Sequence, residues 1–286
     1  MSRWQNSKQL AAASWATLRH DKELLVLPLI SGVASIAIAA TFLVPIGLSS
    51  QGTDAFGETT FEPGALQYAA IFLMYVVLAY VAVFFKVALL FGANERMQGG
   101  DPTVGSALSS AMTKAGAILP WAIISATVSV VLRSLQERSG LLGRFVIGLV
   151  GMAWAAVTFL VLPILVFEGV GVGEAIKRST AMLKRTWGEN LIVNMGIGLL
   201  AFLLCLPGVV LLVAGAATGT ALGFGTTVVI AVVWFIAVAC WASAMGAVFQ
   251  LALYRFAVAG SAPGAFATVD LAHAFAPKSG RGGFGR

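Results

Sequence analysis

The sequence carries very little charge, and this shortage excludes most soluble folds. Asp, Glu, Lys and Arg make up 10% of the 286 residues, whereas hydrophobic types make up 59%. A soluble domain carries about 25% charged residues, because its surface must present groups that water solvates. The composition therefore predicts an integral membrane protein.

Cysteine and histidine are also scarce, which removes the usual components of catalytic and metal sites. Cys205 and Cys240 both lie inside one uncharged run, where we expect small apolar residues and neither a disulfide nor a metal site. His20 and His273 lie in opposite terminal regions. No HExxH, CxxC, Walker or GxSxG pattern occurs. We therefore expect no metal, no cofactor and no enzymatic activity.

The longest uncharged stretch runs from Asn190 to Tyr254, 65 consecutive residues without Asp, Glu, Lys or Arg. A helix crosses the hydrocarbon layer with roughly 20 apolar residues, so this stretch is long enough for two crossings and a turn. Small residues at helical spacing also suit close packing of helices or an oligomer contact. The expected turn is marked by four glycines, Gly215, Gly219, Gly223 and Gly225.

Shorter uncharged runs extend this pattern to an all-α, polytopic membrane fold. We predict three hairpins in a single membrane domain, residues 1–259, with amphipathic cytoplasmic surface helices. One such surface helix is expected at residues 4–20, and a flexible cytoplasmic tail at residues 260–286. The six predicted transmembrane helices are residues 24–48, 65–91, 115–132, 145–167, 191–214 and 226–254.

The basic residues are distributed unevenly between the two sides of this topology. Of the 18 Lys and Arg residues, 15 fall on the side that contains both termini, and the other three are Arg133, Arg138 and Arg144. Lys and Arg accumulate on the cytoplasmic side of membrane proteins. We therefore expect both termini in the cytoplasm. Residues 49–64 carry three acidic and no basic residues, which fits the opposite side.

An internal repeat accompanies the hairpins. The order surface helix, membrane helix, outer loop and returning membrane helix occurs three times. Residues 104–108 resemble residues 172–176, and residues 19–25 resemble residues 185–191. One interpretation is three hairpins about a pseudo-threefold axis along the membrane normal. The other is coincidence, because Ala, Gly, Leu and Val dominate all such sequences.

This six-helix pattern over residues 1–260 resembles families of uncharacterised bacterial membrane proteins. More distantly, it looks like the membrane domain attached to some glycerophosphodiester phosphodiesterases. The resemblance lies in composition and spacing, so no catalytic residue of those enzymes can be transferred to this chain. It implies a multi-pass protein of the bacterial plasma (inner) membrane, with lipid association.

Two sets of charged residues are candidate sites. The first is the basic face of an amphipathic segment after the fourth crossing, for which we expect contact with anionic lipid headgroups. It consists of Lys177, Arg178, Lys184 and Arg185.

The second set lies near the inner ends of the second, fourth and sixth helices and consists of Lys86, Glu168 and Arg255. Two interpretations stay open. The three residues converge into a polar cluster, or the two basic side chains extend to the headgroups while Glu168 caps a helix end. Asn194 and Gln250 are further predicted to form a hydrogen bond across the last hairpin.

These observations favour a non-enzymatic membrane protein that associates with anionic lipid or with a membrane-protein partner. The alternative is a transporter or channel for a small or lipid-like solute. A lipid-directed enzyme using Glu168, Glu174 or Glu189 fits less well, because carboxylates without His, Cys or metal-ligand spacing offer little chemistry. A single Arg-Gly-Gly triplet in the tail gives no reason to expect nucleic-acid binding.

Overall fold

The computed structural model describes residues 22–49, 51–53, 59–61, 64–185 and 190–259. Within these ranges, the backbone alone is described for residues 22, 51–53, 59–61, 183–185, 190–199, 221 and 259. The predicted surface helix at residues 4–20 and the predicted tail at residues 260–286 lie outside the described residues, so both stay predictions.

Helices account for nearly all of the described chain. Six helical stretches there are long and apolar enough to cross a membrane: Glu23–Ser49, Ala65–Met97, Ala115–Glu137, Leu141–Glu168, Leu200–Ala217 and Leu222–Val258. The chain is therefore a multi-pass membrane protein. The elements are η1 (Lys22–Leu25), α2 (Val26–Ser49), β1 (Gln51–Thr53), β2 (Thr59–Phe61), α3 (Ala65–Met97), α4 (Val104–Met112), α5 (Ala115–Glu137), α6 (Leu141–Val157), α7 (Val161–Pro163), the π-helical turn η2 (Ile164–Glu168), α8 (Val172–Arg185), α9 (Asn190–Ala217) and α10 (Ala221–Ala259).

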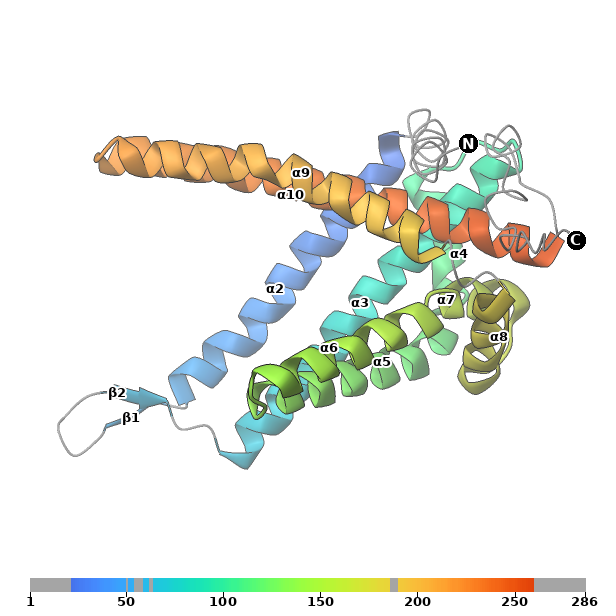
Figure 1. Ribbon diagram of the computed structural model, residues 1–286, viewed down its shortest axis with the longest axis horizontal. Coiled ribbons are helices and arrows are strands. Elements are labelled where there is room, and N and C mark those ends of the chain that lie inside the picture. The colour runs from blue at the N-terminus through green and yellow to red at the C-terminus, as the bar shows by residue number, and fades with distance from the viewer. Residues whose placement is uncertain (1–21, 50, 54–58, 62–63, 186–189, 260–286) are drawn as a thin grey trace, which may run out of the picture.

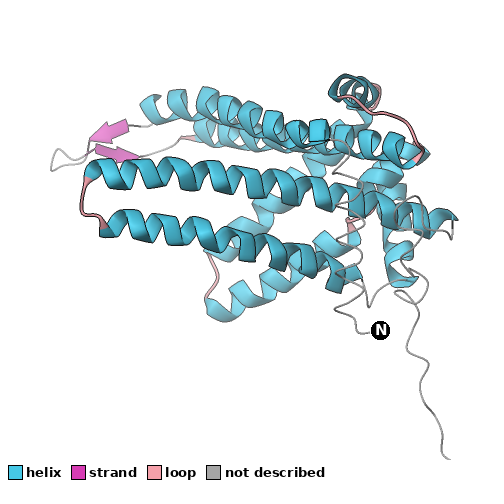
Figure 2. Ribbon diagram, turned by 90° about the horizontal axis from the view of Figure 1, so that it is seen from above, coloured by secondary structure: helices cyan, strands magenta, loops and turns pink. Residues whose placement is uncertain are grey.

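Successive long helices lie side by side in pairs. Helix α2 packs against α3, α5 against α6, and α9 against α10. Figure 1 shows the three pairs converging at one end, where α4, α7 and α8 also lie, and spreading apart toward their connecting turns. Figure 2 shows the turns of all three pairs at the same end of the molecule. We call the convergent end the base.

The buried core lies at the base. Its members come from the base ends of the long helices, including Leu27, Leu90, Leu165 and Phe249. Aromatic rings connect three of these segments, since Phe167 contacts Phe91 at 5.2 Å between centroids and Tyr254 at 5.9 Å. Burial of such large apolar side chains stabilises the base by about 1.5–3 kcal/mol for each side chain. The base is therefore the tightly packed part of the molecule.

Toward the turns, large apolar side chains remain exposed. Examples are Val33 and Ile36 of α2, Phe145 of α6, Val210 of α9 and Val233 of α10. A monomer in water rarely exposes apolar patches of this extent. Lipid chains would cover them without cost, which agrees with helices that cross a bilayer.

The turn between α9 and α10 is shorter than predicted. The predicted glycine-rich turn is wrong in extent, because only residues 218–220 interrupt the two helices and Gly223 and Gly225 lie within α10. Gly219 has φ +63°, a backbone conformation that favours glycine. Gly215 has a different function: a Cβ there would lie 1.7 Å from Oγ1 of Thr227, so glycine permits close contact of α9 and α10.

Two further details differ from or refine the expected connections. The all-α prediction omits a short antiparallel strand pair, in which Gln51 lies opposite Phe61 and Thr53 opposite Thr59.

At the base, α4 begins after Thr103, whose hydroxyl accepts a hydrogen bond from the Ser106 N–H at 3.0 Å. The Ser106 hydroxyl accepts one from the Thr103 N–H in return. This reciprocal capping fixes the start of the helix.

Candidate functional site

The fourth membrane-crossing stretch is broken near the base. The predicted crossing at residues 145–167 lies within the apolar span Leu141–Glu168, but the structure interrupts its helix. Helix α6 ends at Val157, three residues form a turn, α7 contributes one helical turn, and the chain continues as a π-helical turn to Glu168. Interrupted helices leave backbone groups without helical partners, and inside a membrane those groups must be satisfied by the protein.

Pro163 explains part of the break. Proline has no N–H, and its ring collides with the carbonyl four residues earlier, which here belongs to Phe159. The Phe159 carbonyl accepts its hydrogen bond instead from the side-chain amide Nε2 of Gln250, which comes from α10. Gln250 is 1% exposed. A buried polar side chain thus replaces the backbone donor that the proline removes.

Ser179 of α8 satisfies the other side of the break. Its hydroxyl donates to the Val157 carbonyl at 2.5 Å and accepts from the Leu160 N–H at 3.2 Å. Ser179 is 1% exposed, and it and Gln250 are the two buried polar residues among those the structure describes. Both side chains form hydrogen bonds with backbone groups of the interrupted segment. Helices α8 and α10 therefore hold the interrupted segment together.

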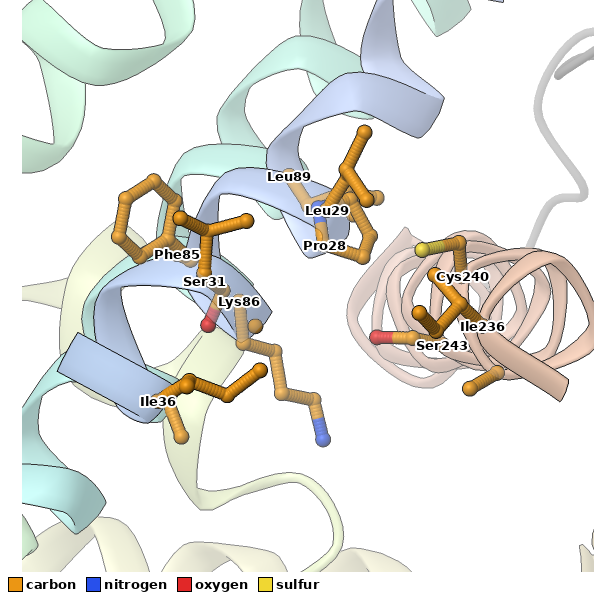
Figure 3. A pocket seen from close by; sticks show the side chains of 14 residues that line it. Pro28, Leu29, Ser31, Ile36, Phe85, Lys86, Leu89, Ile236, Cys240 and Ser243 are labelled. Atoms are coloured by element: carbon orange, nitrogen blue, oxygen red, sulfur yellow. The ribbon is translucent and has the colours of Figure 1, made fainter. Parts of the chain in front are cut away.

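Two cavities adjoin this region and share Lys86 and Ser243. The first, of 460 Å³, lies between α2, α3 and α10 and has mostly apolar walls that include Leu29, Phe85 and Ile236. Figure 3 shows the Lys86 side chain extending from α3 into the space between α2 and α10.

The second cavity, of 510 Å³, lies on the other side of Lys86 and reaches the break. Phe159 and Gln250 line it, together with the hydroxyls of Ser125 and Thr158. The Gln250 carbonyl oxygen Oε1 is buried and has no hydrogen-bond partner among the residues that the structure describes. Buried polar atoms normally have a partner, so this oxygen marks a place where a bound donor would be stabilised.

Lys86 itself makes no hydrogen bond or ion pair with any residue in the described ranges. It precedes the fully buried segment Val87–Leu90 of α3, and it is the one Asp, Glu, Lys or Arg residue among those that line the two cavities. An ammonium in an apolar layer is costly unless a partner or water accompanies it. This residue is therefore a candidate binding group.

The other two members of the predicted inner cluster have protein partners. Glu168 accepts hydrogen bonds from Arg178 Nη1 at 2.5 Å and from the Tyr254 hydroxyl at 3.2 Å. Arg255 donates through Nε and Nη2 to the Asn94 side-chain oxygen, at 3.1 and 2.5 Å. Neither residue bonds to Lys86. The structure thus distributes the three predicted residues over separate contacts.

The basic face of α8 is described in part. Lys177 and Arg178 are exposed on the side of the helix away from the buried Ala175 and Ser179. Arg178 also donates from Nε to Glu174 at 2.9 Å. Its hydrogen bonds to Glu174 and then to Glu168 raise the pKa of Arg178 above its ordinary value. Lys184 and Arg185 belong to α8, but their side chains are outside the described set.

The predicted hydrogen bond between Asn194 and Gln250 and the possibility of a metal site are considered next. Gln250 bonds to Phe159, and the side chain of Asn194 is not among those described, so the predicted Asn194–Gln250 pair stays a prediction. In the described ranges, no three His, Cys, Asp or Glu residues lie close enough together to hold a metal ion.

A family model matches residues 65–264 of this chain, which is more than two thirds of its length. The chain belongs to the family of unknown function DUF6159. No curated protein and no solved structure matches it. The distant similarity to the membrane domain of glycerophosphodiester phosphodiesterases therefore has no support from these comparisons.

The DUF6159 match begins at Ala65, the first residue of α3, and extends past the end of α10. It includes Lys86, the broken segment, α8 and Gln250. It does not include α2, which forms one wall of the first cavity.

Sequence reasoning missed Ser179 as a polar group and assigned Gln250 a different partner. The missed signal was Pro163, which lies deep inside a predicted helix and so predicts an unpaired carbonyl four residues earlier.

Proposed function

We propose that this protein is a non-enzymatic component of the bacterial plasma membrane that associates with anionic lipid headgroups through its cytoplasmic end. In this proposal the three helix pairs are transmembrane hairpins, the base faces the cytoplasm, and both termini lie on that side. The role is one of organising the membrane or a membrane-protein partner. The positive-inside rule supports this orientation, since the predicted topology puts 15 of the 18 Lys and Arg residues on the side of both termini.

The observation that carries the proposal is the placement of α8. Figure 1 shows this helix running crosswise to α5 and α6 at the base. It is held by Ala175 and Ser179 on its buried side and presents Lys177 on its exposed side. A helix that lies flat at a headgroup layer gains on the order of 1 kcal/mol for each basic residue near an anionic surface.

The test compares two variants that each remove three positive charges. In one, Lys177, Lys184 and Arg185 become Gln; in the other, Arg133, Arg138 and Arg144 become Gln on the opposite side. Arg178 is kept in both because it is paired with Glu168 and Glu174. Each protein is placed in bilayers that mix phosphatidylglycerol with phosphatidylcholine, and native mass spectrometry measures which lipids remain bound.

We expect the α8 variant to lose its preference for phosphatidylglycerol and the opposite-side variant to keep it. Equal lipid preference in the two variants would refute the proposal. The topology is checked separately with reporters fused after Arg286 and inserted near Glu58, which we expect in different compartments.

The alternative, a transporter or channel for a small or lipid-like solute, is favoured by one observation. The two cavities that meet at Lys86 lie between the three helix pairs, where a pathway would run. Their largely apolar walls suit a lipid-like solute better than an ion. Labelling of single cysteines placed at Ser125 and at Ser243, from each side of the membrane, would reveal a continuous water-filled path.

A further inference from the structure

We propose that Lys86 binds the phosphate of an anionic phospholipid whose acyl chains occupy the cavity between α2, α3 and α10. This site is separate from the α8 surface. It rests on the membrane-spanning architecture but not on the association of α8 with headgroups. Three features of the molecule support it: the unpaired side chain of Lys86, the mostly apolar walls of the first cavity, and the unpaired acceptor Oε1 of Gln250.

The charge at Lys86 lacks a counterion in the described part of the protein. Glu168 is held by Arg178 and Tyr254 in the base. Asn94, which binds Arg255, lies eight residues along α3 from Lys86, or about 12 Å along the helix axis. Lys86 is thus closer to the middle of the apolar span than the polar contacts of the base. A cation at that depth requires an anion or water to offset its desolvation.

The walls of the first cavity determine what kind of anion fits. Apart from Lys86, its polar side chains are limited to Ser31, Ser243 and the thiol of Cys240; the remainder are aliphatic or aromatic residues or glycine. A free inorganic anion would gain nothing from such walls. A phospholipid places its phosphate at the ammonium and its acyl chains against Leu29 and Ile236, so both parts of the ligand are matched. The two serine hydroxyls are further donors to phosphate oxygens.

The second cavity supplies the place for the end of the headgroup. The Gln250 oxygen that lacks a donor belongs to a residue that lines it, as do the hydroxyls of Ser125 and Thr158. Phosphatidylglycerol carries two headgroup hydroxyls, and one of them would donate to Gln250 Oε1. Phosphatidylcholine carries none and has a cationic headgroup, which Lys86 repels. The site is therefore expected to select phosphatidylglycerol.

Cys240 provides a direct measurement of occupancy because it lines the first cavity beside Lys86. With two cysteines in the chain, Cys205→Ala leaves Cys240 as the single thiol. The protein is held in a neutral maltoside detergent, and the rate of its reaction with N-ethylmaleimide is followed. The probes are dioctanoyl phosphatidylglycerol, dioctanoyl phosphatidylcholine and inorganic phosphate.

At phosphatidylglycerol concentrations about ten times its Kd, labelling should slow about tenfold, because only the unoccupied site reacts. Phosphatidylcholine and inorganic phosphate should leave the rate nearly unchanged. Lys86→Gln should weaken phosphatidylglycerol binding about tenfold, so the same concentration slows labelling only about twofold. Lys86→Arg should retain most of the protection.

A large side chain placed inside the first cavity tests whether acyl chains bind there, and it leaves Lys86 unchanged. No atom lies within 4 Å of a Cβ built at Gly32, which lines the cavity, or at Gly47, which lies outside it on the same helix. Gly32→Leu should therefore fold and lose bound phosphatidylglycerol in native mass spectra. Gly47→Leu, the matched control, should retain it.

Three results would overturn the proposal. These are equal protection by phosphatidylcholine, full protection in Lys86→Gln, and protection by inorganic phosphate alone, which would indicate a simple anion site. The α8 charge variants should leave Cys240 protection intact, so failure of the surface proposal and failure of this one are distinguishable.

Discussion

Gln250 of α10 donates its side-chain hydrogen bond to the carbonyl of Phe159, the group that Pro163 leaves without a backbone donor. The two residues are 91 positions apart in sequence, so the contact connects the last crossing to the interrupted fourth one. Because the donor Gln250 is buried at the base, the strength of this connection can be measured by removing either the donor or the proline.

Gln250→Leu should lower the free energy of unfolding by about 1–3 kcal/mol, since it leaves the partly buried Phe159 carbonyl without its donor. Thermal denaturation in detergent micelles measures the change. Gln98→Leu is the control, because Gln98 is exposed just after α3 and the same substitution there removes no buried partner. Equal stability of the two variants would contradict the role assigned to Gln250.

Pro163→Ala should make Gln250 less important. The alanine restores an N–H that can reach the Phe159 carbonyl, so Gln250→Leu should cost less in that background than in the natural protein. A double-mutant cycle gives the coupling, which we expect at about 0.5–3 kcal/mol. Strict additivity would show that the proline and the glutamine act independently.

Ser179→Ala should destabilise the protein by about 1–3 kcal/mol, because one buried hydroxyl serves both Val157 and Leu160. The effect should extend to α8, which would become more sensitive to proteolysis near Lys177. Ser109→Ala in α4 is the comparison, since the Ser109 hydroxyl is exposed and bonds within its own helix. Unchanged protease sensitivity would argue that α8 is held by its apolar side alone.

Gly215→Leu should cost about 1–3 kcal/mol through overpacking against Thr227. Thr227→Ala should recover part of that loss, because it removes the atoms nearest to the new side chain. Gly225→Leu in α10 serves as the control, since no atom lies within 4 Å of a Cβ there. Circular dichroism during heating in micelles reports each variant.

Arg178 should stabilise α8 docking equally between about pH 6 and about pH 9. Its pKa is raised by Glu174 and Glu168, and a group of this kind contributes fully below its unfolded pKa and loses its effect only as the pH rises through the folded value. Arg178→Gln should therefore reduce stability by a similar small amount at both ends of this range. Added salt should shrink the difference, since the guanidinium is 44% exposed. A difference that changes strongly across the range would show that another titrating group controls docking.

The sequence predicted the membrane class because shortage of charge acts on the whole chain, and it located six crossings from uncharged runs. Helix ends were predicted less well. The second crossing is predicted to end at residue 91, yet α3 continues to Met97, where Asn94 has a tertiary partner in Arg255. Gly223 and Gly225 likewise looked like a turn but lie inside α10, where the packed neighbour α9 decides the backbone conformation.

The contacts of the candidate site could not be predicted, because they depend on which elements meet at the base. The positions of the charged residues along the predicted helices indicate comparable depths for Lys86, Glu168 and Arg255. Those positions contain no information on which of the three residues has a partner. The bond from Gln250 to Phe159 required knowing that the fourth crossing is interrupted and faces α10. Pro163 indicates locally that the fourth crossing is interrupted. That this crossing faces α10 is a property of the assembled fold.

Concentration of the buried side chains at one end has a consequence for how the chain tolerates change. Apolar exchanges near the connecting turns replace one lipid-covered surface with another, so a mutational scan should find those positions permissive. Positions within about two helical turns of Tyr254 should reject most exchanges, because each one disturbs several neighbours at once. Along each crossing, the tolerance to substitution should therefore decline steadily toward the base, and a scan without such a gradient would be incompatible with this architecture.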